Sequence, residues 1–483
     1  MNKKNYVAVA TLAFAMLTSC AGQKEAKSTS GIDLANMDTT VSAGTDFFRY
    51  ACGGWNDAHP LTAEYSRYGT FDELFENSQK QLRELIEGLA AQKNNQAGSA
   101  AQKIGDLYNM AMDSVTLNKQ GAEPVKAMLD KIAGLKDKSE IVPMMTEMAH
   151  IGIGTYFHSY VYADPKNSSL NIFQMGQGGI NLGEKEYYLD TDSITQNIRE
   201  QYKLYIGKLF QLAGFSEADA QQKVADVMEI ETAIAKVSRS ATELRDPEAN
   251  YHKMSFDELK KTIAGIDWDA YMKGLGIQAP AELNVEQVEP IQEVARLMNT
   301  LPLSKHVSYL EYNLLDAAAS CLSDDFVAAR FDFYGKVLSG RQVNQPRWKR
   351  AVNSVNGMLG ELVGEMYVEK YFPAAAKERM VKLVKNLQTA LGERIDAQEW
   401  MSDSTKIRAH EKLAAFHVKV GYPDKWKDYS KLEIKNDSYW ANVCRASEWG
   451  FNDMYSRIGK PVDKDEWLMT PQTVNAYYNP STN

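Results

Sequence analysis

Seven histidines are the first residues to test for metal chemistry, because imidazole is a common ligand of catalytic zinc. They are His59, His150, His158, His252, His306, His410 and His417. A zinc peptidase of the H-E-x-x-H type places two histidines four residues apart on one helix face, and no pair here has that spacing. His410 and His417 come nearest, but the intervening helix would separate them by about 10 Å along its axis. We therefore predict no metal-ligating residue, and expect all seven to be packing or surface side chains.

Other catalytic signatures are also incomplete. Gly335 and Gly340 have the glycine spacing of a phosphate-binding P-loop, but Arg341-Gln342 stands where Lys-Ser or Lys-Thr is needed. Gly176-Gln177-Gly178 lacks the third glycine of a dinucleotide-binding turn, and no G-x-S-x-G nucleophile elbow is present. Carboxylates are too numerous to single out a glycosidase pair. Composition and spacing alone thus identify no catalytic residue.

The N-terminal residues predict export and lipid attachment. Two lysines precede a short apolar stretch over residues 6–17, which is typical of a signal peptide. The following L-T-S-C, which ends at Cys20, resembles the lipobox of bacterial lipoproteins, whose cysteine is acylated. We expect a signal peptide over 1–19, a lipid anchor on Cys20 and a flexible tether over 20–40. The expected location is the bacterial cell envelope, in the periplasm or at the outer-membrane surface. An ordinary secretory signal with a chance cysteine is the alternative.

Composition excludes several classes of protein. The 483 residues include 54 basic and 63 acidic side chains, a net charge of −9 without a basic stripe, so we expect no nucleic-acid partner. No apolar run reaches the roughly 20 residues of a membrane-spanning helix. Beyond Cys20, only Cys52, Cys321 and Cys444 remain, too few and too widely spaced for a zinc cluster or a disulfide framework. We expect three buried thiols, and leave open one disulfide among them.

The pattern of apolar residues predicts a mainly α fold with minor β structure. From about residue 71 to 450, apolar residues recur at helical spacing. Thr70 to Glu73 and Ser255 to Glu258 both fit capping boxes that begin helices. One predicted helix, over 377–399, carries a stripe made of Met380, Leu383, Val384, Leu387, Leu391 and Ile395. Strands are expected within 169–182 and in the tail over 467–478.

Short segments in order along the chain resemble the neprilysin family of zinc metallopeptidases. D-F-F-R-Y-A-C-G-G-W at 46–55 resembles the family's D-F-F-x-Y-A-N-G-x-W, with Cys52 in place of Asn. V-N-A-Y-Y-N-P at 474–480 resembles its V-N-A-Y-Y-x-P. Further segments match in order between them: Tyr68 to Phe71, Glu186 to Leu189, Arg245 to Pro247, Gly364 to Tyr367 and Gly421 to Asp424. The ordered set covers residues 41–483.

This resemblance implies a fold and an activity. In the family, a large helical gating domain closes over a thermolysin-like α+β catalytic domain and admits short peptides. We therefore expect an arm over 41–70 that packs on the catalytic domain, a gating domain over 71–450, and the first strand of a truncated catalytic domain over 451–483. The family's zinc ligands and catalytic Glu belong to H-E-x-x-H and E-x-x-x-D motifs that follow this point. We expect the chain alone to hold no zinc and no catalytic residue, and to be inactive.

The resemblance also implies two substrate-binding residues. The family residues that match Asn475 and Ala476 bind a peptide added as an extra strand. The Asn475 amide can both donate and accept at a peptide backbone. Without the resemblance, Asn475 would be read as a turn former at a strand end. We expect a monomeric, zinc-dependent endopeptidase acting on peptides. Two alternatives stay open: a catalytically dead surface lipoprotein that binds peptides or a partner, and a nutrient-capturing lipoprotein outside this family.

Overall fold

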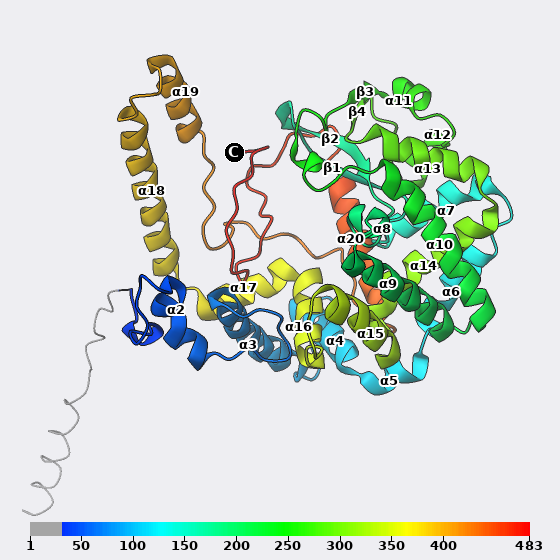
Figure 1. Ribbon diagram of the computed structural model, residues 1–483, viewed down its shortest axis with the longest axis horizontal. Helices are drawn as coiled ribbons and strands as arrows, with labels where there is room; N and C mark the ends of the chain where they lie inside the picture. The colour runs from blue at the N-terminus through cyan, green and yellow to red at the C-terminus, as the bar shows by residue number, and fades with distance from the viewer. Residues whose placement is uncertain (1–30) are drawn as a thin grey trace, which may run out of the picture. The chain divides into compact units, whose positions relative to one another are not determined.

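The computed structural model describes residues 31–483, so the expected signal peptide and Cys20 lie outside the described residues (Figure 1). The described chain is mainly helical and contains one small sheet, which confirms the predicted fold class. It divides into two compact units, one ending at Thr62 and the other running from Ala63 to Asn483. No helix within 31–483 is both long enough and apolar enough to cross a membrane.

The first unit consists of a short 3-10 helix, η1 (Leu34–Asn36), against the helix α2 (Phe47–Ala58). The contact is close because Gly54 has no side chain: a Cβ atom there would lie 2.1 Å from the Ala35 carbonyl oxygen. Arg49 of α2 pairs with Asp38 at 2.8 Å and with Asp57 at 2.7 Å. The Arg49–Asp38 pair is partly buried, whereas the pair with the exposed Asp57 contributes little to stability.

In the labels, η marks a 3-10 helix, except for η5, which is a π-helix. The second unit contains the remaining helices of the described chain. They are α3 (Thr70–Ala90), α4 (Ala100–Met112), α5 (Ser114–Gln120), α6 (Glu123–Ala133), η2 (Lys138–Glu140), α7 (Ile141–His150), α8 (Glu186–Leu189), α9 (Ser193–Leu212), α10 (Glu217–Val237), η3 (Glu243–Arg245), α11 (Phe256–Thr262), α12 (Trp268–Gly274), α13 (Val288–Thr300), α14 (Leu303–Ala318), η4 (Ala319–Cys321), α15 (Asp324–Arg330), η5 (Phe331–Leu338), α16 (Arg347–Met358), α17 (Gly360–Tyr371), α18 (Ala374–Asp396), α19 (Asp403–Ala414) and α20 (Tyr439–Tyr455).

A four-stranded sheet, ordered β1-β2-β4-β3, lies within this helical unit. Strands β1 (Phe157–Asp164) and β2 (Asn167–Gln177) form an antiparallel hairpin, β4 (Glu282–Val285) runs parallel to β2, and β3 (Lys253–Ser255) is antiparallel to β4. β2 confirms the strand predicted within 169–182. β1, β3 and β4 were not predicted, and β3 and β4 are each too short to show a period of two.

The core is built where α10 packs against α9 and α14. Phe210, Ile230 and Tyr309 are among its fully buried side chains. The Glu231 carboxylate is also fully buried and accepts hydrogen bonds from Tyr188 at 2.7 Å and Tyr202 at 2.9 Å. Burial raises the pKa of Glu231 to about 7, although the tyrosine hydroxyls partly offset the effect.

Helix starts test the predicted capping boxes. Ser255 caps α11 as predicted, because its backbone N–H donates to Glu258 at 2.8 Å while its hydroxyl accepts from the Glu258 N–H. The prediction for Thr70 is wrong by one residue. Gly69 is the N-cap of α3, and the Asp72 carboxylate accepts its N–H at 2.9 Å.

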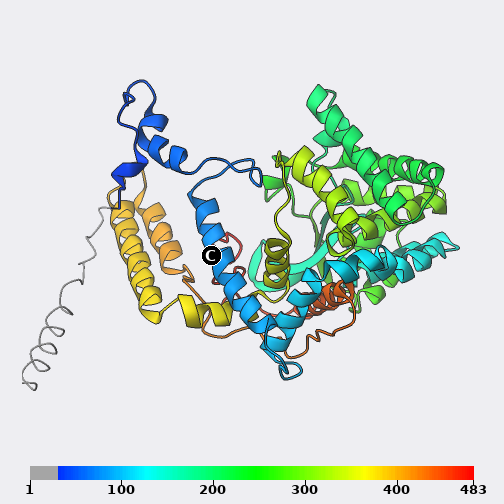
Figure 2. The same cartoon turned by 90° about the horizontal axis from the view of Figure 1, so that it is seen from below.

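α18 confirms the helix predicted over 377–399 and begins after Pro373. It forms a pair with α19 (Figure 2). Much of its apolar stripe is exposed, with Leu383 at 48% and Leu387 at 60%. The spacing therefore predicted the helix correctly, but within the described residues only Ile395 of the stripe is buried.

The strand predicted over 467–478 is wrong for the structure described here. The tail has no regular secondary structure beyond α20 except an isolated bridge between Pro461 and Leu170. A strand requires a neighbour to pair with its backbone. No strand in the described chain pairs with residues 467–478, so the alternating side chains alone do not produce one.

Candidate peptide-binding segment

The C-terminal tail, residues 456–483, is attached to the helical unit just before its exposed part begins. Gln472 is buried, and its amide nitrogen donates to the Gly360 carbonyl at 2.9 Å and to Asn356 at 2.5 Å. The Ser78 hydroxyl donates to the Gln472 carbonyl at 3.1 Å. The Gln472 anchor thus joins the tail to α3, α16 and α17.

The Gln472 anchor lies close to α17 because residue 364 is a glycine. A Cβ atom at Gly364 would lie 2.9 Å from Pro471 Cδ and 3.0 Å from the Gln472 side-chain oxygen. The absence of a side chain at Gly364 therefore makes room for the Pro471 and Gln472 side chains against α17.

A second anchor lies a few residues later. Asn479 donates a hydrogen bond to the Tyr162 hydroxyl of β1, and the Tyr478 ring contacts Phe416 edge-on with centroids 5.7 Å apart. The backbone N–H of His417 donates to the Asn483 carbonyl at 2.9 Å. Residues 473–478 are therefore held at both ends.

Between the anchors, Asn475 and Ala476 are both exposed. The Asn475 side-chain oxygen accepts the Ala476 N–H at 2.8 Å, and the Asn475 N–H donates to Thr473 at 3.1 Å. Among the described residues, the backbone groups of Tyr477 have no hydrogen-bonding partner. The structure thus places both predicted residues on one accessible stretch with free backbone groups, but not on a preformed strand.

The residues present do not form a zinc site. Within 31–483, no group of three or more His, Cys, Asp or Glu side chains could hold a metal ion. Several histidines have other partners: His150 and His252 contact backbone carbonyls at 2.9 Å, and His410 pairs with Asp396 at 2.7 Å. His306 is fully buried against the Tyr156 hydroxyl at 2.7 Å, and burial lowers its pKa to about 4.

Within residues 31–483, Cys321 and Cys444 are not reactive thiols. Cys52, Cys321 and Cys444 are all free thiols, and only Cys321 is buried, so the expectation of three buried thiols is wrong for the other two. Burial raises the pKa of Cys321 to about 11 and that of Cys444 to about 12, which keeps both thiols protonated at neutral pH.

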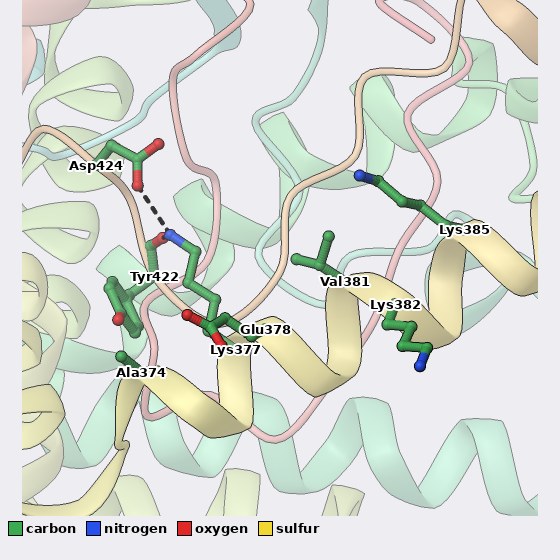
Figure 3. A pocket seen from close by; sticks show the side chains of 8 residues that line it. All are labelled: Ala374, Lys377, Glu378, Val381, Lys382, Lys385, Tyr422 and Asp424. Carbon is green, nitrogen blue, oxygen red and sulfur yellow. Dashed lines mark hydrogen bonds and ion pairs between the residues drawn. The ribbon is translucent and has the colours of Figure 1, made fainter.

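An open hollow of about 540 Å³ lies along α18 (Figure 3). Lys377 points toward Asp424 at 2.9 Å and donates to the Tyr422 carbonyl at 2.8 Å, whereas Lys382 and Lys385 point away from each other. The hollow contains neither Asn475 nor Ala476. Its lysine stems suit a solvated surface better than a catalytic site.

The Gln472 anchor was missed by the sequence analysis. The sequence signal that could have found it is the pair Gly360 and Gly364, two glycines in one helix that leave room for side chains of the tail to pack against it. Nothing in the sequence links that pair to a residue more than 100 positions away.

Comparison with known proteins identifies relatives along nearly the whole chain. The family model described as Peptidase family M13 matches residues 43–423. Endothelin-converting enzyme 1 of Rattus norvegicus is 30% identical over 475 residues, which cover 93% of this chain and 61% of the relative. The Homo sapiens enzyme is 29% identical, with 93% and 60% covered. The chain thus spans about three-fifths of the length of these curated relatives.

Solved structures give the same relationship. Zinc metalloprotease Zmp1 of Mycobacterium tuberculosis, in complex with an inhibitor, superposes with a TM-score of 0.87 at 34% identity, covering 93% of this chain and 68% of that chain. PepO from Lactobacillus rhamnosis has a TM-score of 0.80 at 20% identity, and the match covers 89% of this chain and 68% of that chain. At this identity the match shows a similar fold alone. Because the family model matches well over half of its residues, the chain belongs to peptidase family M13, the neprilysin family of metallopeptidases.

Proposed function

We propose that this chain is the substrate-receiving part of a zinc-dependent endopeptidase that hydrolyses short peptides. The observation that carries the proposal is the exposed stretch over 473–478, which contains Asn475 and Ala476 and is held at both ends. In this proposal, residues 71–450 form the gating domain, 41–70 form an arm and 451–483 begin the catalytic domain.

The proposed contact is addition of an extended peptide to this stretch. Unpaired backbone N–H and C=O groups, such as those of Tyr477, can exchange hydrogen bonds with a peptide lying alongside. The Asn475 amide would turn from the Ala476 N–H to the peptide, donating and accepting at its backbone. Because these hydrogen bonds involve only the backbone of the bound peptide, they would position peptides of many different sequences in the same way.

We further propose that the 483-residue chain alone binds peptides without cleaving them. Zinc in the family polarises the scissile carbonyl and activates a water. The printed sequence contains no H-E-x-x-H motif, and the donor set of residues 31–483 does not fit a zinc site. Zinc analysis and a fluorogenic-peptide assay of the purified chain should detect neither stoichiometric zinc nor cleavage. Stoichiometric zinc with chelator-sensitive cleavage would contradict this part of the proposal.

Asn475→Ala tests the binding residues. Loss of the amide removes hydrogen bonds worth on the order of 1.4 kcal/mol together, so the affinity for a labelled extended peptide should fall about tenfold in fluorescence anisotropy. Asn436→Ala is the matched control, because Asn436 is an exposed asparagine outside the segment. Equal affinity in both variants, or no binding to the unmodified chain, would reject the segment as a peptide site.

The second candidate is a catalytically dead lipoprotein that binds peptides or a partner. The exposed stretch over 473–478 fits this function as well, because peptide binding alone would serve both functions. Reading the gene beyond codon 483 separates them. An in-frame H-E-x-x-H motif would support the endopeptidase, and an immediate stop codon would support the binding protein.

A further inference from the structure

A second cavity, of about 430 Å³, lies within the helical unit between α5, α15, η5 and α16. Its lining includes four guanidinium groups, those of Arg330, Arg341, Arg347 and Arg350. Leu117, Val327 and Phe331 supply apolar wall, and Asn344, Ser354 and Tyr439 add amide and hydroxyl groups. We call this the arginine cavity. It contains neither Asn475 nor Ala476.

Two of the four arginines are neutralised by neighbouring carboxylates. Arg330 pairs with Asp316 at 2.7 Å. Arg347 pairs with Asp324 and also donates to the Ala111 carbonyl at 3.1 Å. Each of these carboxylates is thus already engaged by one guanidinium group.

The other two arginines have no carboxylate partner within residues 31–483. Arg350 donates one hydrogen bond, from Nε to the Gln345 carbonyl at 3.2 Å. The Arg341 guanidinium lies 5.6 Å from the centre of the Phe331 ring, and its buried Nε has no hydrogen-bonding partner. The arginine cavity therefore has two positive charges more than its neighbouring carboxylates balance.

This excess charge is costly because the groups are partly removed from water. Burial, together with the nearby Arg347 charge, lowers the pKa of Arg350, and the Asp324 carboxylate offsets this only in part. A bound anion would offset both effects.

The backbone around Arg341 holds it in place. Gly335 lies in the π-helix η5, and a Cβ atom there would come within 2.3 Å of the Phe331 ring. Glycine therefore lets the ring lie against the helix, where it forms cavity wall. The Arg341 N–H donates to the Gly335 carbonyl at 3.0 Å, which fixes the start of that side chain beside the ring.

We propose that the arginine cavity binds an oxyanion, a carboxylate or phosphate group of a small molecule, between Arg341 and Arg350. The guanidinium fork matches the paired oxygens of both groups. The cavity volume suits a small organic anion. The Ser354 and Tyr439 hydroxyls are hydrogen-bonded to each other at 2.5 Å, so the pair keeps one O–H proton for the remaining polar atoms of the anion. The chain carries a net charge of −9, which disfavours nonspecific anion binding and makes a local site the source of any saturable binding.

Calorimetric titration of the purified 483-residue chain tests the proposal, with inorganic phosphate and citrate as probes at constant ionic strength. We expect saturable binding of at least one probe. Binding of phosphate only, of citrate only or of both would each support the site and identify the oxyanion it accepts. No saturable binding of either probe would overturn the proposal.

Variants locate the binding. Arg341→Gln and Arg350→Gln should each weaken it at least tenfold, and Arg341→Lys, which keeps the charge but loses the fork, should weaken it less. Arg408→Gln is the control, because exposed Arg408 pairs only with Glu411 on the same helix. Circular dichroism of each variant without anion verifies that it is folded. If Arg341→Gln does not fold, the two single variants Arg341→Lys and Arg350→Gln are enough for the test. Unchanged binding in both the Arg341 and the Arg350 variants would also overturn the proposal.

Discussion

Glu231 shows how one buried carboxyl group makes stability depend on pH. It accepts hydrogen bonds from Tyr188, Tyr202 and Asn181 but forms no ion pair within the described chain. Burial raises its pKa from 4.5 to about 7. The folded state therefore holds a proton that the unfolded state releases between these values. The contribution of Glu231 to the free energy of unfolding is therefore fully present below pH 4.5 and is lost as the pH rises through 7.

Glu231→Gln removes this dependence. Glutamine keeps the size of the side chain and does not ionise. The free energy of unfolding of the variant minus that of the unmodified chain should therefore rise by on the order of 3 kcal/mol between pH 4.5 and 7.5. Urea denaturation at a series of pH values measures the difference. Glu399→Gln is the control, since Glu399 is exposed. A parallel pH dependence in Glu231→Gln and the unmodified chain would show that Glu231 does not titrate in this range.

At the scale of elements, the approach of the tail to α17 depends on Gly364. Gly364→Ala should displace Pro471 and Gln472, because the new Cβ would lie 2.9 Å from Pro471 Cδ. Chymotrypsin should then cut near Tyr477 several-fold faster while the helical unit stays folded. Gly357→Ala, in α16, is the matched control, since its Cβ would meet nothing within 4 Å. Equal cleavage rates in the two variants would mean that the anchor does not hold the tail.

Elements that depend on neighbours in sequence were predictable, and those that depend on distant partners were not. Ser255 and Glu258 are three residues apart, so their capping box could be read directly. The tail alternates like a strand, but pairing requires a neighbouring strand that the described chain does not provide. Asn475 was found through resemblance to a family, since nothing local distinguishes it from a turn former. The arginine cavity could not be predicted because Arg341 and Arg350 line one cavity only after four helical elements pack together.

At the scale of the whole molecule, we propose that the chain is anchored in the bacterial cell envelope through Cys20. The lipobox-like L-T-S-C carries this proposal. Acylation at Cys20 would give stable attachment only with two or more acyl chains. Labelling of cells with radioactive palmitate should mark the unmodified protein, and Cys20→Ser should abolish the label and retain the signal peptide. Cys52→Ser is the control, since Cys52 lies after the expected tether. Persistent label in Cys20→Ser would place the modification elsewhere.

The two anchors at Gln472 and Asn479 have a consequence for how tightly the segment between them could bind. A chain fixed at both ends samples few conformations, so most of the entropy that a free tail would lose on binding has already been lost during folding. Lengthening the stretch with flexible residues would restore that freedom and weaken binding, although every contact with the ligand could still form.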